Sequence, residues 1–160
     1  MHAKVVAVQE ALHSAGVETQ VRELPESTRT APEAAAAVGV GLAQIVKSLV
    51  FLAGNELVVA LVSGANRASV DRMEAAVGSP LRQADARTVK ERTGYAIGGV
   101  APVGQPPGTV VLIDKDLLTH DVVWAAAGTP RAVFPISADE LVRVTGGRVL
   151  ELKEAQSAVS

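Results

Sequence analysis

The sequence of 160 residues contains no cysteine. This absence excludes disulfides, thiolate nucleophiles and cysteine metal ligands. The three histidines, His2, His13 and His120, are far apart and lack the i, i+4 spacing of a helical zinc site. The sequence gives little support to a Ser-His-Asp arrangement, and no pair of carboxylates stands out in an apolar setting. We therefore expect neither a metal ion nor an organic cofactor.

Aromatic residues are also scarce, at 2% of the chain, although hydrophobic residues make up 48%. The core must therefore consist mainly of Ala, Val and Leu, and the length fits one domain over residues 1–160. The formal net charge of −2 gives no large basic surface of the kind that binds long nucleic-acid duplexes. Any contact with nucleic acid should therefore be small and local.

Long hydrophobic runs are missing as well. No stretch reaches about 18 uninterrupted apolar residues, so no membrane span is expected. The N-terminal residues lack the apolar segment of a signal peptide. With no cysteine and no targeting segment, a cytoplasmic location is the expectation.

The hydrophobic patterns and capping residues that are present predict alternating helices and strands. The predicted helices cover residues 3–15, 31–38, 70–77, 86–93 and 138–145. The predicted strands cover residues 17–24, 44–53, 57–64, 109–114, 122–128, 131–136 and 148–152. Several of these strands form hairpins, which favours the α+β class with a mixed or largely antiparallel sheet over a doubly wound parallel sheet.

Residues 44–53 place a lysine, Lys47, inside an apolar, β-branched run. In a strand both faces of this run would be mostly apolar. The run is similar to a phosphate loop, but Val46 stands where the motif needs a glycine, and a strand follows where the motif needs a helix. Lys47 could instead protect a strand edge, or it could hold an anion or a polarised carbonyl oxygen at the mouth of an apolar pocket.

Two further segments are candidates for a site. Residues 94–105 form a loop rich in glycine and proline, which exposes backbone N–H groups and lets a ligand approach closely. A plain turn between a helix and a strand is the alternative. Residues 124–134 contain small side chains that could line a small pocket, or that could belong to an ordinary hairpin. Trp124, the only tryptophan, is expected to pack in the core.

Read together, these segments resemble the YbaK/ProX family, also known as the prolyl-tRNA-synthetase-associated editing domain. The resemblance rests on "QIVKSLVF", "ALVSG", "TGYAIGGVAPVGQ" and "AAGTPRAVF", in this order, and extends over about residues 17–152. It implies a curved mixed sheet flanked by helices. It also implies hydrolysis of mischarged aminoacyl-tRNA, typically tRNA for proline carrying Ala or Cys. At this length and without a linker, we expect a free-standing trans-editing protein.

The resemblance also implies the site. Lys47 matches the family's essential lysine and would contact the terminal nucleotide or its phosphate. Gly98, Gly99, Val100, Pro102 and Gly104 match the family's glycine-rich loop, whose backbone N–H groups would stabilise the oxyanion. The remaining predicted substrate contacts are Thr28, Thr30, Ser63, Gly128 and Thr129. Some relatives carry a serine or a histidine within residues 125–131, and this chain has small residues there, so the edited amino acid stays open.

The expected partners are the acceptor end of an aminoacyl-tRNA and a prolyl-tRNA synthetase. A second function fits the same residues. The domain could bind aminoacyl-adenosine or a charged 3′ end without turnover, as a regulator or adaptor. Lys47 together with an intact glycine-rich loop favours the hydrolase.

Overall fold

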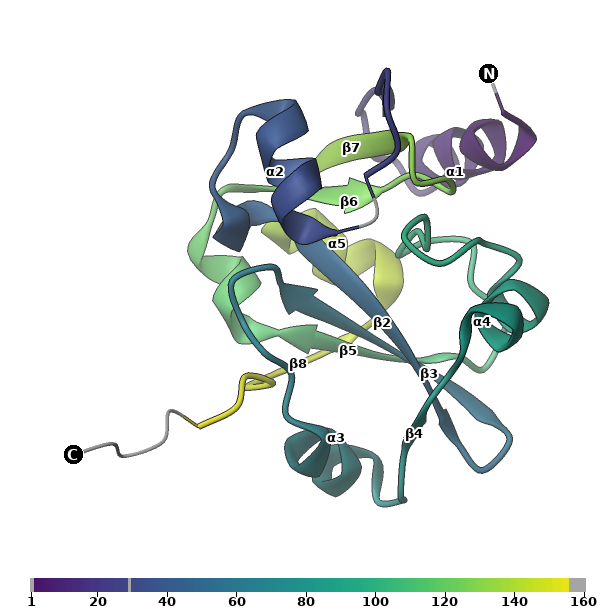
Figure 1. Ribbon diagram of the computed structural model, residues 1–160, viewed down its shortest axis with the longest axis vertical. Coiled ribbons are helices and arrows are strands. Elements are labelled where there is room, and N and C mark those ends of the chain that lie inside the picture. Colours follow the sequence, from purple (N-terminus) through teal and green to yellow (C-terminus); the bar gives the residue numbers. More distant parts are fainter. Residues whose placement is uncertain (1, 29, 156–160) are drawn as a thin grey trace.

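The computed structural model describes residues 2–28 and 30–155 (Figure 1). The helices are α1 (Ala3–Ser14), α2 (Ala31–Val38), α3 (Val70–Val77), α4 (Ala86–Thr93) and α5 (Ala138–Thr145), with 3-10 helices η1 (Leu42–Gln44) and η2 (Lys115–Thr119). The strands are β1 (Arg22–Glu23), β2 (Val46–Ala53), β3 (Glu56–Ser63), β4 (Arg82–Gln83), β5 (Val110–Asp114), β6 (Val122–Ala126), β7 (Ala132–Ser137) and β8 (Arg148–Leu150). In the described ranges, no helix has the length and apolar character needed to cross a membrane.

The helices from α2 to α5 have the same length and the same kinds of capping residue. Each has eight residues, which is too short for stability without caps or packing. Each begins at a side chain that accepts a hydrogen bond from a backbone N–H three residues later, and each ends at a glycine with a left-handed backbone. The N-caps are Thr30, Ser69, Asp85 and Ser137. These predicted helix boundaries are confirmed.

The strands form two sheets. The larger has the order β4-β2-β3-β5-β8, in which β2 pairs antiparallel with β3 and β4, and β5 pairs parallel with β3 and β8. The smaller is antiparallel with the order β1-β7-β6. A single bridge between Ile45 and Trp124 links the two. The α+β class with mixed strand directions is confirmed, although the strands are divided between two sheets and the strand predicted over 17–24 is reduced to β1.

The β2–β3 hairpin is buried on both faces. On one face, Val50, Leu52 and Val59 join the main core, which also contains α1, α5 and the small sheet. On the other face, Phe51 and Val58 pack in a second core with Met73 of α3 and the C-terminal segment. This two-sided burial explains why both strands are apolar at nearly every position. Lys47 lies near the start of β2, where the burial becomes partial.

Candidate active site

A cavity of about 430 Å³ lies where β2, α2, the glycine-rich loop and the β6–β7 hairpin meet. Its predicted members are Thr28, Thr30, Lys47, Gly98 and Val100. Apolar or small residues supply most of the remaining wall: Ala31, Pro32, Ala34, Val38, Ile45, Val46, Leu49, Gly64, Ile97, Trp124, Ala125, Ala126, Ala132 and Val133. A small apolar cavity with few polar groups is typical of a ligand site.

Among the described residues that line this cavity, Lys47 is the only one with a charged side chain. It is half-buried, and its Nζ donates a hydrogen bond to the backbone carbonyl oxygen of Asn66 at 2.8 Å. Within residues 2–28 and 30–155, Lys47 forms no ion pair. An ammonium group has three N–H donors, so two remain for a ligand. This environment fits the anion-binding or carbonyl-binding interpretation of Lys47.

The electrostatics of Lys47 follow from its position. Burial lowers the pKa of the Lys47 ammonium below its usual 10.5, and the negative charge of Asp114 partly opposes this effect. Moreover, β4 pairs only with Phe51 and Leu52 of β2. The described residues therefore provide no strand partner on that side of β2 at residues 47–49, and the lysine lies beside an open backbone edge.

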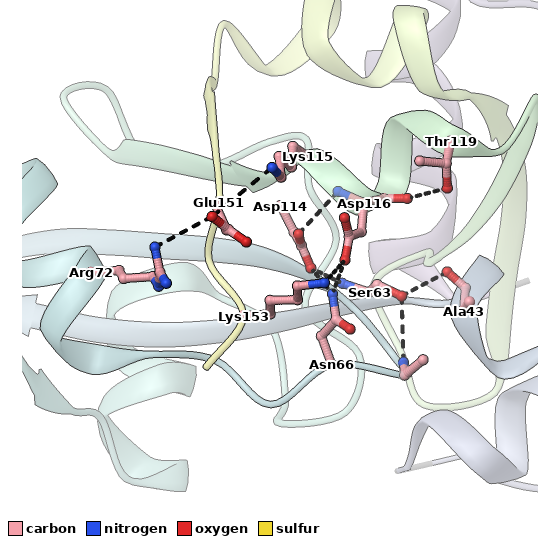
Figure 2. Close-up of polar contacts among 11 residues, drawn as sticks. Ala43, Ser63, Asn66, Arg72, Asp114, Lys115, Asp116, Thr119, Glu151 and Lys153 are labelled. Atoms are coloured by element: carbon pink, nitrogen blue, oxygen red, sulfur yellow. Dashed lines mark hydrogen bonds and ion pairs between the residues drawn. The ribbon is translucent and has the colours of Figure 1, made fainter. Parts of the chain in front are cut away.

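A polar network that includes Asp114 and Asn66 lies at the turn after β3 (Figure 2). Asp114, at the end of β5, is fully buried. Its Oδ2 accepts hydrogen bonds from the Ser63 backbone N–H at 3.1 Å and from Asn66 Nδ2 at 2.8 Å, and its Oδ1 accepts one from the Asp116 N–H at 3.1 Å. The parallel pairing of β3 with β5 brings these groups together. Asp114 thereby holds Asn66, whose carbonyl oxygen accepts the hydrogen bond from Lys47.

The outer part of this network is partly exposed. Asn66 Nδ2 also donates to Asp116 Oδ2 at 2.8 Å, and Lys153 Nζ lies 3.6 Å from the same oxygen. The hydrogen bond from Asn66 and the nearby lysines lower the pKa of the Asp116 carboxyl. Both carboxylates therefore hold the turn after β3 in place. Among the described residues, no group of three or more His, Cys, Asp or Glu side chains is arranged to hold a metal ion.

The glycine-rich loop faces the cavity with only part of its length. Gly98 and Val100 line the cavity. Gly99 packs against the β6–β7 turn, since a Cβ there would lie 2.6 Å from both Cα and C of Thr129. Its N–H already donates to the Ala96 carbonyl oxygen at 2.9 Å, so this N–H is not free to bind an oxyanion.

Residues 25–144 match the family profile described as the aminoacyl-tRNA editing domain. This match covers most of the chain. The chain belongs to the aminoacyl-tRNA editing domain family. This editing domain is also 31% identical, over 134 residues, to the uncharacterized protein YwhH of Bacillus subtilis (strain 168), which corresponds to 82% of this chain and 85% of that protein.

Solved structures similar to this editing domain have the same fold. One crystal structure, described as that of a candidate trans-editing enzyme for prolyl-tRNA synthetase, is 48% identical, has a TM-score of 0.91 and matches 97% of this chain and 99% of that chain. A hypothetical protein, APE2540, is 35% identical, has a TM-score of 0.86 and matches 92% of this chain and 99% of that chain. The predicted family resemblance is confirmed.

Several predicted contacts of the editing domain lie outside the cavity wall. The buried Ser63 hydroxyl donates to the Ala43 carbonyl oxygen at 2.8 Å, so it joins the end of β3 to η1. Gly128 and Thr129 line a different hollow, on the far side of the contact with Gly99. Pro102 and Gly104 also lie outside the lining, and a Cβ on Gly104 would lie 2.5 Å from the Tyr95 hydroxyl oxygen. We therefore assign these residues to the scaffold of the cavity.

The two predicted threonines line the cavity of the editing domain, but their hydroxyls have partners within the chain. Thr28 Oγ1 donates to the Pro130 carbonyl oxygen at 3.0 Å. Thr30 Oγ1 donates to Glu33 Oε1 at 2.8 Å and accepts from the Glu33 N–H, which caps α2. Both residues therefore position the α2 side of the cavity. A ligand could reach their hydroxyls only in addition to these hydrogen bonds.

Ser48 is a polar member of the site that the sequence analysis missed. It lines the cavity, its Oγ is shielded from solvent, and this oxygen has no hydrogen-bond partner among the described residues. Leaving a buried hydroxyl unpaired costs about 1–3 kcal/mol. The alternation of side chains along β2 gave no signal for it, because alternation places Ser48 on the face opposite Lys47. The structure shows that both residues nevertheless border the same cavity.

Proposed function

We propose that this editing domain is a deacylase that acts in trans in the cytoplasm and hydrolyses the ester of tRNA(Pro) carrying Ala or Cys. The observation that carries the proposal is the small apolar cavity that contains one lysine with free N–H donors. Membership of the editing family supports the activity. The similarity to a structure described as a candidate trans-editing enzyme for prolyl-tRNA synthetase supports tRNA(Pro) as the substrate. It also supports action on tRNA that a separate synthetase has charged.

In this proposal Lys47 binds the terminal nucleotide or its phosphate and so fixes the ester next to Gly98 and Val100. Water attacks the carbonyl carbon, and negative charge develops on the carbonyl oxygen. Backbone N–H groups of the loop and the Lys47 ammonium stabilise this charge. The bond to the ribose oxygen then breaks, that oxygen takes a proton, and the amino acid leaves. A ribose hydroxyl of the substrate assists the water, since positioning can supply much of the rate.

The small wall residues support a small amino acid. Ala125, Ala126 and Ala132 line the cavity beside Trp124. In this proposal the alanines leave room for an Ala or Cys side chain, and the bulky Trp124 indole beside them limits the space for larger ones. Selection by size amounts to about 1–3 kcal/mol per methylene group. Editing by this domain should therefore prefer small side chains by one to two orders of magnitude.

The decisive experiment is deacylation of tRNA(Pro) charged separately with Ala, Cys, Ser and Pro. Rapid hydrolysis of the Ala or Cys ester, with the Pro ester left intact, would support the proposal and name the substrate. Binding of all charged forms without hydrolysis would instead support the adaptor, which uses the same lysine to hold the charged 3′ end. A charged tRNA for another amino acid, tested in parallel, would show whether the tRNA itself is selected.

Ser48→Ala separates stability from activity. The substitution removes a buried hydroxyl for which the described residues offer no hydrogen-bond partner. We therefore expect the free energy of unfolding to stay unchanged or to rise by up to about 1 kcal/mol. If the hydroxyl binds the substrate, KM should rise about 10-fold, which corresponds to one lost hydrogen bond. Thermal unfolding and steady-state deacylation would measure the two effects.

Ser48→Thr is the matched control, because it keeps a hydroxyl at this position of the strand. It should retain more of the substrate affinity than Ser48→Ala does. Equal kinetics for Ser48→Ala and the wild type would show that Ser48 does not contact the substrate.

A further inference from the structure

A second hollow, of about 510 Å³, lies beside the candidate active site, and we call it the basic cleft. Lys4 of α1, Lys90 of α4 and Arg131 of the β6–β7 turn supply its cations, and His2 also lines it. Among the described residues of its wall, Glu23 is the one carboxylate. The cleft thus has a surplus of positive charge, although the whole chain has a net charge of −2.

Two of these cations converge on one residue. Lys90 Nζ donates to the Gly94 carbonyl oxygen at 3.2 Å. Lys4 Nζ lies 3.2 Å from the point that a Cβ on Gly94 would occupy. In the part of the chain that the structure describes, neither lysine forms an ion pair, and neither does Arg131. Neighbouring like charges repel each other, so an anion bound between them would be favoured.

The basic cleft shares a wall with the cavity. The contact between Gly99 and Thr129 separates the two, with Gly98 lining the cavity and Thr129 lining the cleft. On the small sheet, Ala132 lines the cavity and its strand partner Glu23 lines the cleft. The cavity and the basic cleft are therefore neighbours across the β6–β7 turn.

We propose that the basic cleft binds backbone phosphates of the RNA substrate next to its 3′-terminal nucleotide. This inference rests on the proposed function, because it takes the 3′ end to lie in the cavity. Lysine and arginine supply most of the sequence-independent affinity for a nucleic-acid backbone, and this affinity falls as salt rises. A small, local cluster of cations suits the acceptor end and does not need a basic surface over the whole protein.

The test is the double variant Lys4→Glu/Lys90→Glu, measured with two substrates. The first is full-length tRNA(Pro) charged with alanine, and the second is a short alanyl ester of adenosine, which has no phosphates to reach the cleft. We expect kcat/KM for the tRNA to fall at least about 10-fold at about 0.1 M salt, while kcat/KM for the short ester stays within about twofold. The dependence of tRNA affinity on salt should also become weaker, by a slope of roughly one for each lost phosphate contact.

The matched control is Arg82→Glu/Arg148→Glu. It makes the same change in net charge at two exposed positions of the large sheet, neither of which lines the cleft. This control should leave the tRNA kinetics close to those of the wild type. An equal loss in both double variants would assign the effect to overall charge and would overturn the proposal. If Lys4→Glu impairs folding, Lys90→Gln alone replaces the double variant, because Lys90 lies on the exposed side of α4. It should lower kcat/KM for the tRNA in the same direction, but by less.

Fluorescence anisotropy can measure the binding of uncharged tRNA(Pro). Because this binding needs no hydrolysis, the measurement tests the cleft separately from the proposed function. Weaker binding by the cleft variant, with the control variant unchanged, supports the cleft even if no ester is hydrolysed by the wild type. Unchanged binding and unchanged tRNA kinetics in the cleft variant overturn it. A parallel fall for tRNA and for the short ester would also overturn it, since the residues would then act on the chemistry and not on the RNA backbone.

Discussion

Replacing Lys47 with alanine should lower kcat/KM for deacylation by about 10²–10³-fold, the cost typical of removing one group that stabilises an oxyanion. In the described lining of the cavity Lys47 is the only charged side chain, and the backbone carbonyl oxygen of Asn66 occupies just one of its three N–H donors. Among the described residues of the lining, no other cation is available to replace it. Single-turnover hydrolysis of the preferred mischarged tRNA would measure the loss.

The fold should survive this substitution. Lys47 is half-buried without an ion pair in the described ranges, and burial disfavours its charged form. The free energy of unfolding should therefore change by less than about 1 kcal/mol. Lys47→Arg is the matched control, because it keeps a cation and loses the compact point charge, and it should recover only part of the rate. Full activity in Lys47→Ala would contradict the role proposed for the lysine.

The pH profile gives an independent check on the same cation. Burial lowers the pKa of the Lys47 ammonium below 10.5. The charged, active form is therefore lost as the pH rises through this lowered pKa, and the enzymatic rate should fall on the alkaline side. Uncatalysed ester hydrolysis rises with pH and must be subtracted. In the same window stability should rise slightly with pH, because the unfolded chain binds the proton more strongly than the folded chain does.

Much of the fold could be predicted because the local signals agree. The capping residues and terminal glycines defined four short helices, and the apolar runs defined the β2–β3 hairpin. The two-residue strand β4 and the 3-10 helices η1 and η2 were not predicted. Such short elements depend on tertiary contacts, for example the pairing of β4 with Phe51 and Leu52 near the end of β2. The division into two sheets likewise depends on contacts between distant segments.

The site was less predictable than the fold. Lys47 stood out because a cation in an apolar strand needs a reason. Ser48 and Ser63 both lie in polar breaks of apolar strands, and the sequence could not show which hydroxyl has a partner. The structure shows that Ser63 bonds to Ala43 and that Ser48 has no described partner. The basic cleft was hidden for a similar reason, because Lys4 and Lys90 meet only through the packing of α1 and α4 around Gly94.

Asp114→Asn should impair both stability and catalysis, since Asp114 is the buried link between the sheet and Lys47. The carboxylate accepts three hydrogen bonds, from the N–H groups of Ser63, Asn66 and Asp116. An amide has only one acceptor oxygen, so at least one of these donors would face an NH₂ group. We expect the free energy of unfolding to fall by about 2–4 kcal/mol, given the cost of unpaired buried groups next to a lost charge. Urea denaturation would measure the fall, and exposed Asp121→Asn is the control.

The catalytic effect distinguishes a positioning role from a merely structural one. Without the carboxylate, the backbone carbonyl oxygen of Asn66 is held less firmly, so the Lys47 ammonium is misplaced. We therefore expect kcat/KM to fall about 10–100-fold. Asp114 also raises the pKa of Lys47. Its loss should therefore move the alkaline limb of the rate profile to lower pH, in the variant fraction that remains folded. A lower rate with an unmoved limb would mean that Asp114 supports the fold without acting on the charge of Lys47.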